Sequence, residues 1–257
     1  MDLIQASARN QAAWADWQLR AHGIECRYSD SLWSCWQPGE ATEIHPQAVT
    51  LVPDSSVENP ASVLEIEQLM AAREQEHLEV VDWWSTLDLT PLGFELAANT
   101  AIEPSPYLVR PPGEYPPDAV PTELEVSRVN TLEALVEFEE ASFEGFEYAG
   151  AFKPGRWHAP ASLDDPDMQY FTGRVDGQVV SASIAVISDG VVGIFGVATR
   201  PAYRRRGYGT ALTWVALRSA PTLPAVLGPS AIGEPLYRKM GFRDFHQFRV
   251  WRRQGSP

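Results

Sequence analysis

The run RPAYRRRGYGTAL, residues 200–212, constrains the fold and the ligand of this chain more than any other feature. It places two glycines, Gly207 and Gly209, directly after a block of arginines. The apolar run GVVGIFGVAT precedes it, and the helix-like run TALTWVALRSA follows. A strand, a basic glycine loop and a helix in this order form an anion site, because loop amides and a helix N-terminus present N–H donors to phosphate. The sequence therefore predicts an α/β fold with a phosphate-bearing ligand at this loop.

The charge of the chain divides sharply along the sequence. Residues 1–123 contain 20 Asp and Glu against 5 Arg and no Lys, whereas residues 124–257 contain 14 acidic against 15 basic residues. The segment PPGEYPPDAVPTE, at 111–123, contains five prolines and is typical of an extended linker. We therefore predict two domains, 1–120 and 121–257. The net charge of −14 argues against nucleic acid as a partner, because phosphate backbones require a basic face.

Several bulk features favour a soluble cytoplasmic protein. No apolar run approaches the roughly 18–20 residues of a membrane helix, and the N-terminus MDLIQASARN lacks the pattern of a signal peptide. The two cysteines, Cys26 and Cys35, are too few for a disulfide framework. We expect no membrane partner, no metal, and a monomer or a homodimer.

The C-terminal half has the pattern of alternating strands and helices. Strands are predicted where apolar residues alternate between turns, and helices where they recur every three or four residues. The predicted strands cover 124–129, 168–174, 178–188, 191–199, 225–230 and 245–253. The predicted helices cover 131–143, 209–219 and 233–241.

The N-terminal half repeats nearly the same order without the first strand. Its predicted helices cover 8–23 and 58–76, and its predicted strands cover 24–29, 31–36, 48–53 and 77–84, with a short turn and two further strands within 90–112. Both halves also end alike, in TPLGFE and in YRKMGFRD, each before a strand. We therefore expect an α/β (α+β) protein built by a degenerate duplication. Each domain would hold a mixed, mostly antiparallel sheet flanked by helices, and the C-terminal domain would be complete.

The loop and the segment that follows it resemble the GNAT superfamily of acyl-CoA-dependent N-acyltransferases. Residues 204–209 fit the pattern R-x-x-G-x-G, and the resemblance extends over GVATRPAYRRRGYGTAL (196–212) and GPSAIGEPLYRKMGF (228–242). Other glycine motifs fit worse, because the chain has no G-x-x-x-x-G-K-[ST] and lacks the third glycine of a dinucleotide loop. The element order of 124–257 also fits this fold, so the resemblance covers about half of the chain. Tandem members with one degenerate half are known in this superfamily, and the N-terminal half has LVPDSSVENPAS in place of the glycine loop.

The resemblance implies acetyl-CoA (coenzyme A) as the cofactor. Backbone amides of the loop and the helix N-terminus would bind the pyrophosphate, and the edge of the preceding strand would bind the pantetheine arm. The amide of Val197 would polarise the thioester carbonyl. Ser230 stands where many relatives carry a pantetheine-binding Asn. The expected cofactor-binding residues are Val197, Ala198, Thr199, Arg204, Arg205, Arg206, Gly207, Tyr208, Gly209, Thr210 and Ser230.

The resemblance also implies Tyr237 as the general acid that protonates the departing thiolate. The general base stays open, because Gly193 stands where some relatives carry a Glu on the fourth strand. Glu144, Glu147, His158 or a chain of waters could serve instead. Five aromatic residues could wall an acceptor pocket: Phe143, Phe146, Tyr148, Phe152 and Trp157.

Together these features predict an N-acyltransferase. It would move an acetyl group from acetyl-CoA to a primary amine, on a small molecule or a peptide, by direct attack in a ternary complex. The alternative is a protein of the same fold that binds acyl-CoA without turnover, as a sensor or a scaffold. Tyr237 favours the enzyme, whereas the missing strand Glu keeps the alternative open.

Overall fold

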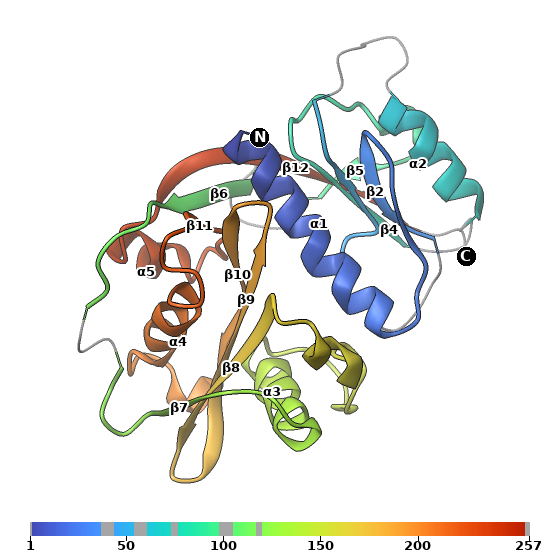
Figure 1. Cartoon of the computed structure of the whole chain (residues 1–257). Helices are drawn as coiled ribbons and strands as arrows, with labels where there is room; N and C mark the ends of the chain where they lie inside the picture. Colours follow the sequence, from blue (N-terminus) through green and yellow to red (C-terminus); the bar gives the residue numbers. More distant parts are fainter. Residues whose placement is uncertain are drawn as a thin grey trace.

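The strands of the protein join in one 12-stranded sheet that spans the chain (Figure 1). The computed structural model describes residues 2–36, 44–53, 61–72, 77–97, 105–116 and 120–254. The strands are β1 (Cys26–Tyr28), β2 (Leu32–Cys35), β3 (Ala48–Thr50), β4 (Leu78–Asp82), β5 (Glu95–Leu96), β6 (Ser105–Arg110), β7 (Glu125–Arg128), β8 (Met168–Val175), β9 (Gln178–Ser188), β10 (Val191–Thr199), β11 (Ala225–Leu227) and β12 (Arg243–Arg253). The helices are α1 (Leu3–Ala21), α2 (Ala61–Ala72), α3 (Leu132–Gly145), α4 (Tyr208–Leu217) and α5 (Glu234–Lys239), with short 3₁₀ turns η2 (Thr90–Leu92), η3 (Pro160–Asp164) and η4 (Pro201–Tyr203).

The element order agrees with the predicted order in both halves. The outer parts of the helix predicted over 58–76, and part of the region predicted as strands within 90–112, lie outside the described residues. None of the described helices is long and apolar enough to cross a membrane.

The predicted duplication is visible in the strand pairing. In the N-terminal half β1 pairs antiparallel with β2, β2 antiparallel with β3, and β3 parallel with β4 after α2. In the C-terminal half β8, β9, β10 and β11 repeat these three pairings, with α4 between the last two strands. The matching endings also agree, since Gly93 and Gly241 both have left-handed backbone, with φ of 79° and 90°, before the buried residues Phe94 and Phe242. The predicted fold class, two related units with mixed sheets, is confirmed.

The two halves exchange strands across the predicted boundary. Strand β6, from the first half, lies between β11 and β12 and pairs antiparallel with both. Strand β12, from the second half, continues past β6 and pairs with β4 and β5 of the first half. The sheet of the C-terminal half therefore contains a strand from the first 120 residues, and the expectation that this half is complete by itself does not hold for its sheet. The boundary at 120/121 stays a prediction.

Helices cover the central strands on both faces. Val192 and Ile194 of β10 pack in one apolar cluster with α4 and α5. Phe195 of the same strand packs instead with α3 and with Trp14 of α1. Helix α1 therefore reaches across from the first half and lies against β9 and β10 of the second half, as Figure 1 shows.

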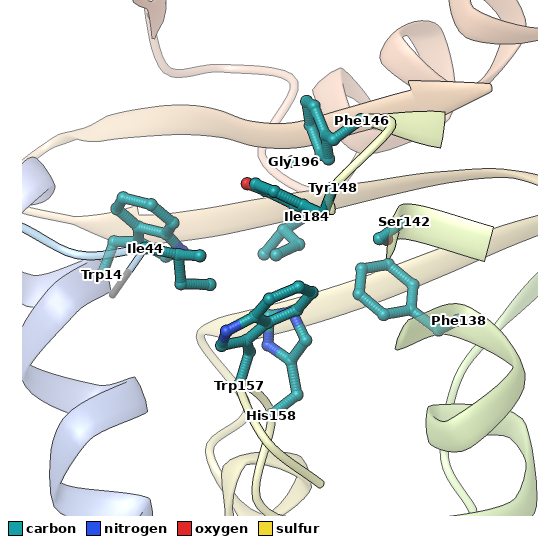
Figure 2. Close-up of a pocket in the computed structure, with 10 residues that line it drawn as sticks. All are labelled: Trp14, Ile44, Phe138, Ser142, Phe146, Tyr148, Trp157, His158, Ile184 and Gly196. Atoms are coloured by element: carbon teal, nitrogen blue, oxygen red, sulfur yellow. The ribbon is translucent and has the colours of Figure 1, made fainter. Parts of the chain in front are cut away.

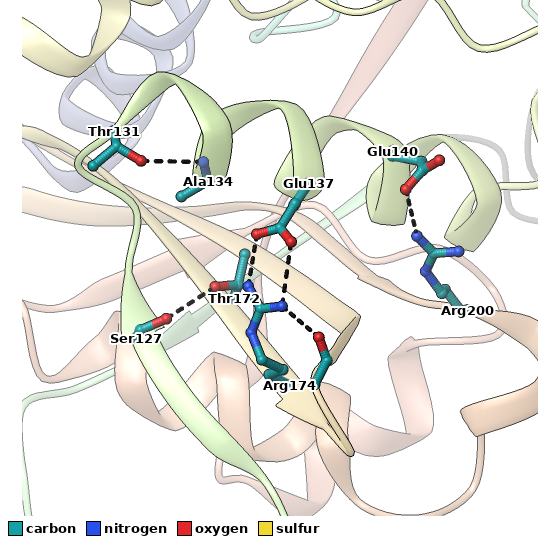
Figure 3. Close-up of polar contacts among 9 residues, drawn as sticks. Ser127, Thr131, Ala134, Glu137, Glu140, Thr172, Arg174 and Arg200 are labelled. Carbon is teal, nitrogen blue, oxygen red and sulfur yellow. Dashed lines mark hydrogen bonds and ion pairs between the residues drawn. The ribbon is translucent and has the colours of Figure 1, made fainter.

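Helix α3 is fixed to the sheet by polar contacts (Figure 3). Thr131 caps its N-terminus by accepting a hydrogen bond from the amide of Ala134. Glu137 pairs with Arg174 of β8 at 2.6 Å, and Glu140 pairs with Arg200 at 3.0 Å. Arg200 is buried, so the second pair holds the C-terminal end of α3 against the end of β10.

The strand exchange predicts that residues 121–257 cannot fold stably alone. Without β6 the edges of β11 and β12 lose their hydrogen-bonding partner and are open to aggregation. A fragment of residues 105–257 restores β6 and lacks the remainder of the first half, so it isolates the contribution of this strand. We expect 105–257 to resist urea better than 121–257, measured by circular dichroism, and the full chain to resist best. Equal stability of 121–257 and the full chain would contradict the exchange.

Candidate functional site

The loop between β10 and α4 has the backbone of an anion site. Arg205 and Gly207 both adopt left-handed backbone, with φ of 67° and 85°. Helix α4 begins at Tyr208, and no side chain caps it. Within the described ranges, no group accepts a hydrogen bond from the amides of Tyr208, Gly209 or Thr210. These N–H groups, together with the positive end of the helix dipole, are free to bind a phosphate oxygen.

The three loop arginines have different surroundings. Arg204 donates to the carbonyl oxygen of Gly145 at 2.8 Å and pairs with Glu147 at 2.8 Å. Its guanidinium therefore ties the loop to the end of α3. Arg205 and Arg206 are exposed and form no ion pair with a described residue, although Arg206 lies over the ring of Tyr203.

Tyr208 and Thr199, also predicted to bind the cofactor, direct their side chains elsewhere. Tyr208 is buried, and its hydroxyl donates to a carboxylate oxygen of Glu123 at 3.2 Å. The Thr199 hydroxyl lies 2.9 Å from that of Ser181 on β9. Tyr208 and Thr199 can therefore bind a cofactor through their backbone groups. Gly207 and Gly209 have no side chains and can likewise bind it only through the backbone.

Strands β10 and β11 form an open wedge above this loop. They pair in parallel only at Val192–Ala225 and Gly193–Val226, so no described strand covers the edge of β10 beyond Gly193. On its other side β10 bulges against β9, because the register shifts between Phe195 and Ala198. The exposed edge carries Val197, Ala198 and Thr199, and an extended ligand could pair with it as a neighbouring strand does.

Tyr237 lies on α5, in the apolar cluster that joins this helix to β10, β11 and α4. Burial raises the pKa of its phenol to about 12. No described residue forms a hydrogen bond with its hydroxyl, so the proton is not held by a neighbour. Ser230 is exposed, and its hydroxyl accepts a hydrogen bond from the amide of Gly233 at 3.1 Å, which supports the start of α5.

A pocket of about 110 Å³ opens beside the bulge of β10 (Figure 2). Its lining residues come from α1, the segment before β3, α3, the loop after α3, and strands β9 and β10. They are Trp14, Ile44, Phe138, Ser142, Phe146, Tyr148, Trp157, His158, Ile184 and Gly196. Of the five aromatic residues predicted to wall such a pocket, Phe146, Tyr148 and Trp157 line it. Phe143 stacks on Trp157 from outside, and Phe152 packs on Phe143.

Comparison with known proteins agrees with this geometry. A sequence model of the Acetyltransferase (GNAT) family matches residues 132–242, which contain α3, the wedge, the loop and Tyr237. Residues 132–242 form a GNAT acetyltransferase domain. No curated protein matches the sequence.

Solved structures share the fold of the GNAT domain together with the half that precedes it. A GCN5-related N-acetyltransferase from Kribbella flavida is 19% identical, with a TM-score of 0.63 over 95% of this chain and 96% of its own. A conserved protein of unknown function from Staphylococcus epidermidis is 11% identical, with a TM-score of 0.61 over 90% and 93%. A GNAT-family protein from Novosphingobium aromaticivorans is 16% identical, with a TM-score of 0.57 over 97% and 99%. The arrangement of both halves is therefore a shared fold.

The three predicted candidates for a general base in the GNAT domain have different surroundings. Glu144 pairs with Arg200 at 2.5 Å, and Glu147 pairs with Arg204. Neither carboxylate lines the pocket. His158 does line it, and burial lowers its pKa to about 3. His158 is therefore neutral at pH 7 but accepts a proton weakly.

One residue that the sequence analysis did not select, Glu139, positions the pocket wall. Glu139 of α3 is buried, and its carboxylate accepts hydrogen bonds from the amides of Gly155, Trp157 and His158. Glu139 therefore holds the loop that carries Trp157 and His158 against helix α3. Its place on the apolar stripe of the helix, four residues after Leu135 and four before Phe143, was the only available signal in the sequence.

The structure explains why Gly193 replaces the strand Glu of some relatives. A Cβ atom at Gly193 would lie 1.9 Å from Oδ1 of Asn10 and 2.5 Å from the ring of Phe195. Asn10 belongs to α1, and its amide nitrogen donates to the carbonyl of Val186 and the hydroxyl of Ser188. The first half of the chain therefore occupies the space into which a side chain at 193 would project. No three described His, Cys, Asp or Glu residues gather to hold a metal there or elsewhere.

The close approach of Asn10 predicts that Gly193→Ala destabilises the protein. Overpacking of this kind costs about 1–3 kcal/mol, measured as the free energy of unfolding in urea. Truncation of the partner in Gly193→Ala/Asn10→Ala should recover part of the loss, so the two changes should not add. The matched control is Gly209→Ala, where the nearest atom to the new Cβ lies at an ordinary 3.5 Å. A Gly193→Ala variant as stable as the wild type would show that α1 is not seated on β10.

Proposed function

We propose that this protein transfers an acetyl group from acetyl-CoA to a primary amine by direct attack in a ternary complex. The observation that carries the proposal is the wedge between β10 and β11, with the uncapped N-terminus of α4 at its base. The wedge offers a free strand edge to an extended arm, and the helix offers free amides to a pyrophosphate. The acetyltransferase family of residues 132–242 supports acyl transfer as the class of reaction.

The residues present fit coenzyme A in two places. The amides from Arg205 to Thr210 would bind the pyrophosphate, with Arg205 and Arg206 adding charge, while Arg204 stabilises the loop. Val197, Ala198 and Thr199 would bind the pantetheine arm, and Ser230 lies beyond β11 on the opposite side of the wedge. Acetyl-CoA supplies the acetyl thioester. The amide of Val197 would then donate to the carbonyl oxygen as negative charge develops on it.

The reaction needs a neutral amine and a proton for the leaving group. The amine nitrogen forms a bond to the acetyl carbon, the carbon–sulfur bond breaks, and coenzyme A leaves as a thiol. Tyr237 would supply that proton. Because burial raises its pKa to about 12, the phenol stays protonated throughout the neutral range. The same burial disfavours a free thiolate and a free phenolate alike, so the proton would move as the carbon–sulfur bond breaks.

The amine must lose a proton before or during attack. His158 is the only one of the three candidate bases that lines the pocket, and its low pKa makes it a weak base. A chain of waters would therefore carry the proton to solvent. We infer one cofactor site per chain, because the first half has no glycine loop and carries most of the negative charge. We further infer a cytoplasmic protein that binds neither nucleic acid nor membrane and is a monomer or a homodimer.

A second function, an acyl-CoA sensor without turnover, is favoured by one observation. No carboxylate of a described residue lines the pocket where a base would be expected. Such a sensor would bind acetyl-CoA with the same loop and would release no thiol when amines are added.

The loop assignment predicts that Gly207→Val weakens binding of coenzyme A at least tenfold, measured by calorimetry. The left-handed backbone at Gly207 disfavours a β-branched side chain, and the shifted loop would lose charge-assisted hydrogen bonds worth about 1.5–3 kcal/mol each. Gly177→Val is the matched control, because Gly177 has a φ of 81° in a turn between β8 and β9. The Gly177→Val variant should lose about as much stability as Gly207→Val and should keep its affinity for coenzyme A. Undiminished affinity in Gly207→Val would refute the loop as the pyrophosphate site.

The assignment of Tyr237 predicts that Tyr237→Phe lowers kcat by about 10²–10⁴-fold with little change in cofactor affinity. Only an unpartnered hydroxyl is removed, so the variant should fold normally. Tyr107→Phe is the control, because Tyr107 is a buried tyrosine on β6 whose hydroxyl has no described partner. Thiol release from acetyl-CoA is the measurement. Unchanged turnover in Tyr237→Phe would reduce the residue to a packing role.

A further inference from the structure

We propose that the pocket beside Gly196 selects acceptor amines that carry a single uncharged ring with a hydrogen-bond-accepting oxygen, and that Trp14 of the first half makes this selection. The inference rests on the proposed function, because it assigns the acceptor of that reaction. Gly196 directly precedes Val197, the candidate oxyanion donor, so a group held in the pocket lies beside the reacting centre.

The charge of the pocket excludes ionised side groups. None of the described residues that line it is an Asp, Glu, Lys or Arg. His158 on its wall and His45 next to Trp14 are both neutral at pH 7, because burial lowers the pKa of each to about 3. A charged substituent would lose its water here without gaining a counter-ion, which is costly.

The size and walls of the pocket fit one ring. Its volume of about 110 Å³ is somewhat below the roughly 150 Å³ of an apolar cavity that binds benzene, so the pocket has room for no more than one ring. Figure 2 shows the rings of Trp14, Tyr148 and Trp157 around a common space, with Ile184 and Gly196 on the strands behind it. Aromatic rings favour a further ring in stacked or edge-on contact.

Polar atoms just behind the pocket wall lack partners among the described residues and are closed to solvent, so a ligand with an acceptor atom would pair with them once the rings turn to admit it. Three lining residues that are more than nine-tenths buried carry such atoms: Nε1 of Trp157, Oγ of Ser142 and Nδ1 of His158. Nε1 of Trp14 is also without a partner in the described part of the chain. Buried polar groups in proteins are nearly always paired. Because an indole nitrogen only donates, the missing partner of each tryptophan is an acceptor, such as a phenol or ether oxygen.

Trp14 is held firmly enough to act as a selective wall. Its indole stacks on Phe195 of β10 at 4.5 Å between ring centroids, and its edge meets His45 at 4.4 Å. The half of the chain without a glycine loop therefore contributes directly to the acceptor site. This contribution gives the degenerate half a role in specificity.

The test compares amines with the full chain and acetyl-CoA, with thiol release as the readout. The panel is tyramine, 2-phenylethylamine, butylamine and 1,5-diaminopentane. We expect kcat/KM to be highest for tyramine, and at least about tenfold lower for the diamine, whose second charge would enter the pocket. Trp14→Ala should raise KM for tyramine about tenfold and leave butylamine nearly unchanged. Trp14→Phe should keep the preference for a ring and lose the preference for tyramine over 2-phenylethylamine.

The matched control is Trp17→Ala, because Trp17 lies on the same helix, is partly buried and does not line the pocket. A preference for the diamine, or a tyramine KM that Trp14→Ala does not change, would overturn the inference while thiol release upheld the proposed function. A second measurement recognises the case in which the enzymatic function fails and the pocket assignment holds. It is calorimetry with p-cresol on the chain saturated with coenzyme A. If p-cresol binds and Trp14→Ala abolishes binding, but no amine releases thiol, the pocket assignment stands and the enzymatic function fails. If p-cresol does not bind and no ring is preferred, the pocket assignment is wrong.

Discussion

Strands β10 and β11 pair over only two residues and then diverge, and the free strand edge of the proposed site depends on that divergence. It leaves the edge of β10 without a partner from Ile194 to Thr199. The glycine loop lies at the end of the same strand, where α4 presents unpaired amides. The bulge at Gly196 and Val197 turns the strand so that the wedge and the aromatic pocket meet. A continuous β10–β11 ladder would close this edge and leave no place for an extended ligand beside β10.

The exchange of β6 and β12 holds this open geometry in place. Because β6 closes the far side of β11, the short strand β11 does not depend on β10 for its position. On the other face, α1 lies on β10 at Gly193 and places Trp14 against Phe195. The first half thus supports the wedge from one side and walls the pocket from the other. The first half has no glycine loop of its own, which agrees with a supporting role for it.

Local pattern was enough to predict the elements, because each strand and helix has the periodicity of the face it buries. The loop at 204–209 was likewise evident, since its glycines and arginines are consecutive in sequence. The pairing between strands could not be predicted from the sequence. Period-two alternation specifies which face of a strand is buried, but it does not specify which strand lies beside it. Prolines at 111–123 indicated a linker, yet the strand just before them pairs with strands that come more than 110 residues later.

Several site residues were beyond the reach of sequence for the same reason. Trp14 and Asn10 have the appearance of ordinary residues on an amphipathic helix, and only the docking of α1 brings them to β10. Glu139 gains its role from three amides about 16 to 19 positions away. Conversely, Arg204 matched the motif by position, but its ion pair with Glu147 shows a side chain engaged within the protein. Charge and motif together predicted a ligand for the loop, while the proposed selectivity for the acceptor rests on contacts between the halves.

The central claim is a single acetyl-CoA site in the wedge of the GNAT domain, assembled with the support of a half that binds none. Calorimetric titration of the full chain with acetyl-CoA tests it most directly, through the number of molecules bound at saturation. The account predicts one molecule per chain. Two molecules per chain would show that the first half retains a site of its own, and no binding would show that the wedge and loop do not form a cofactor site.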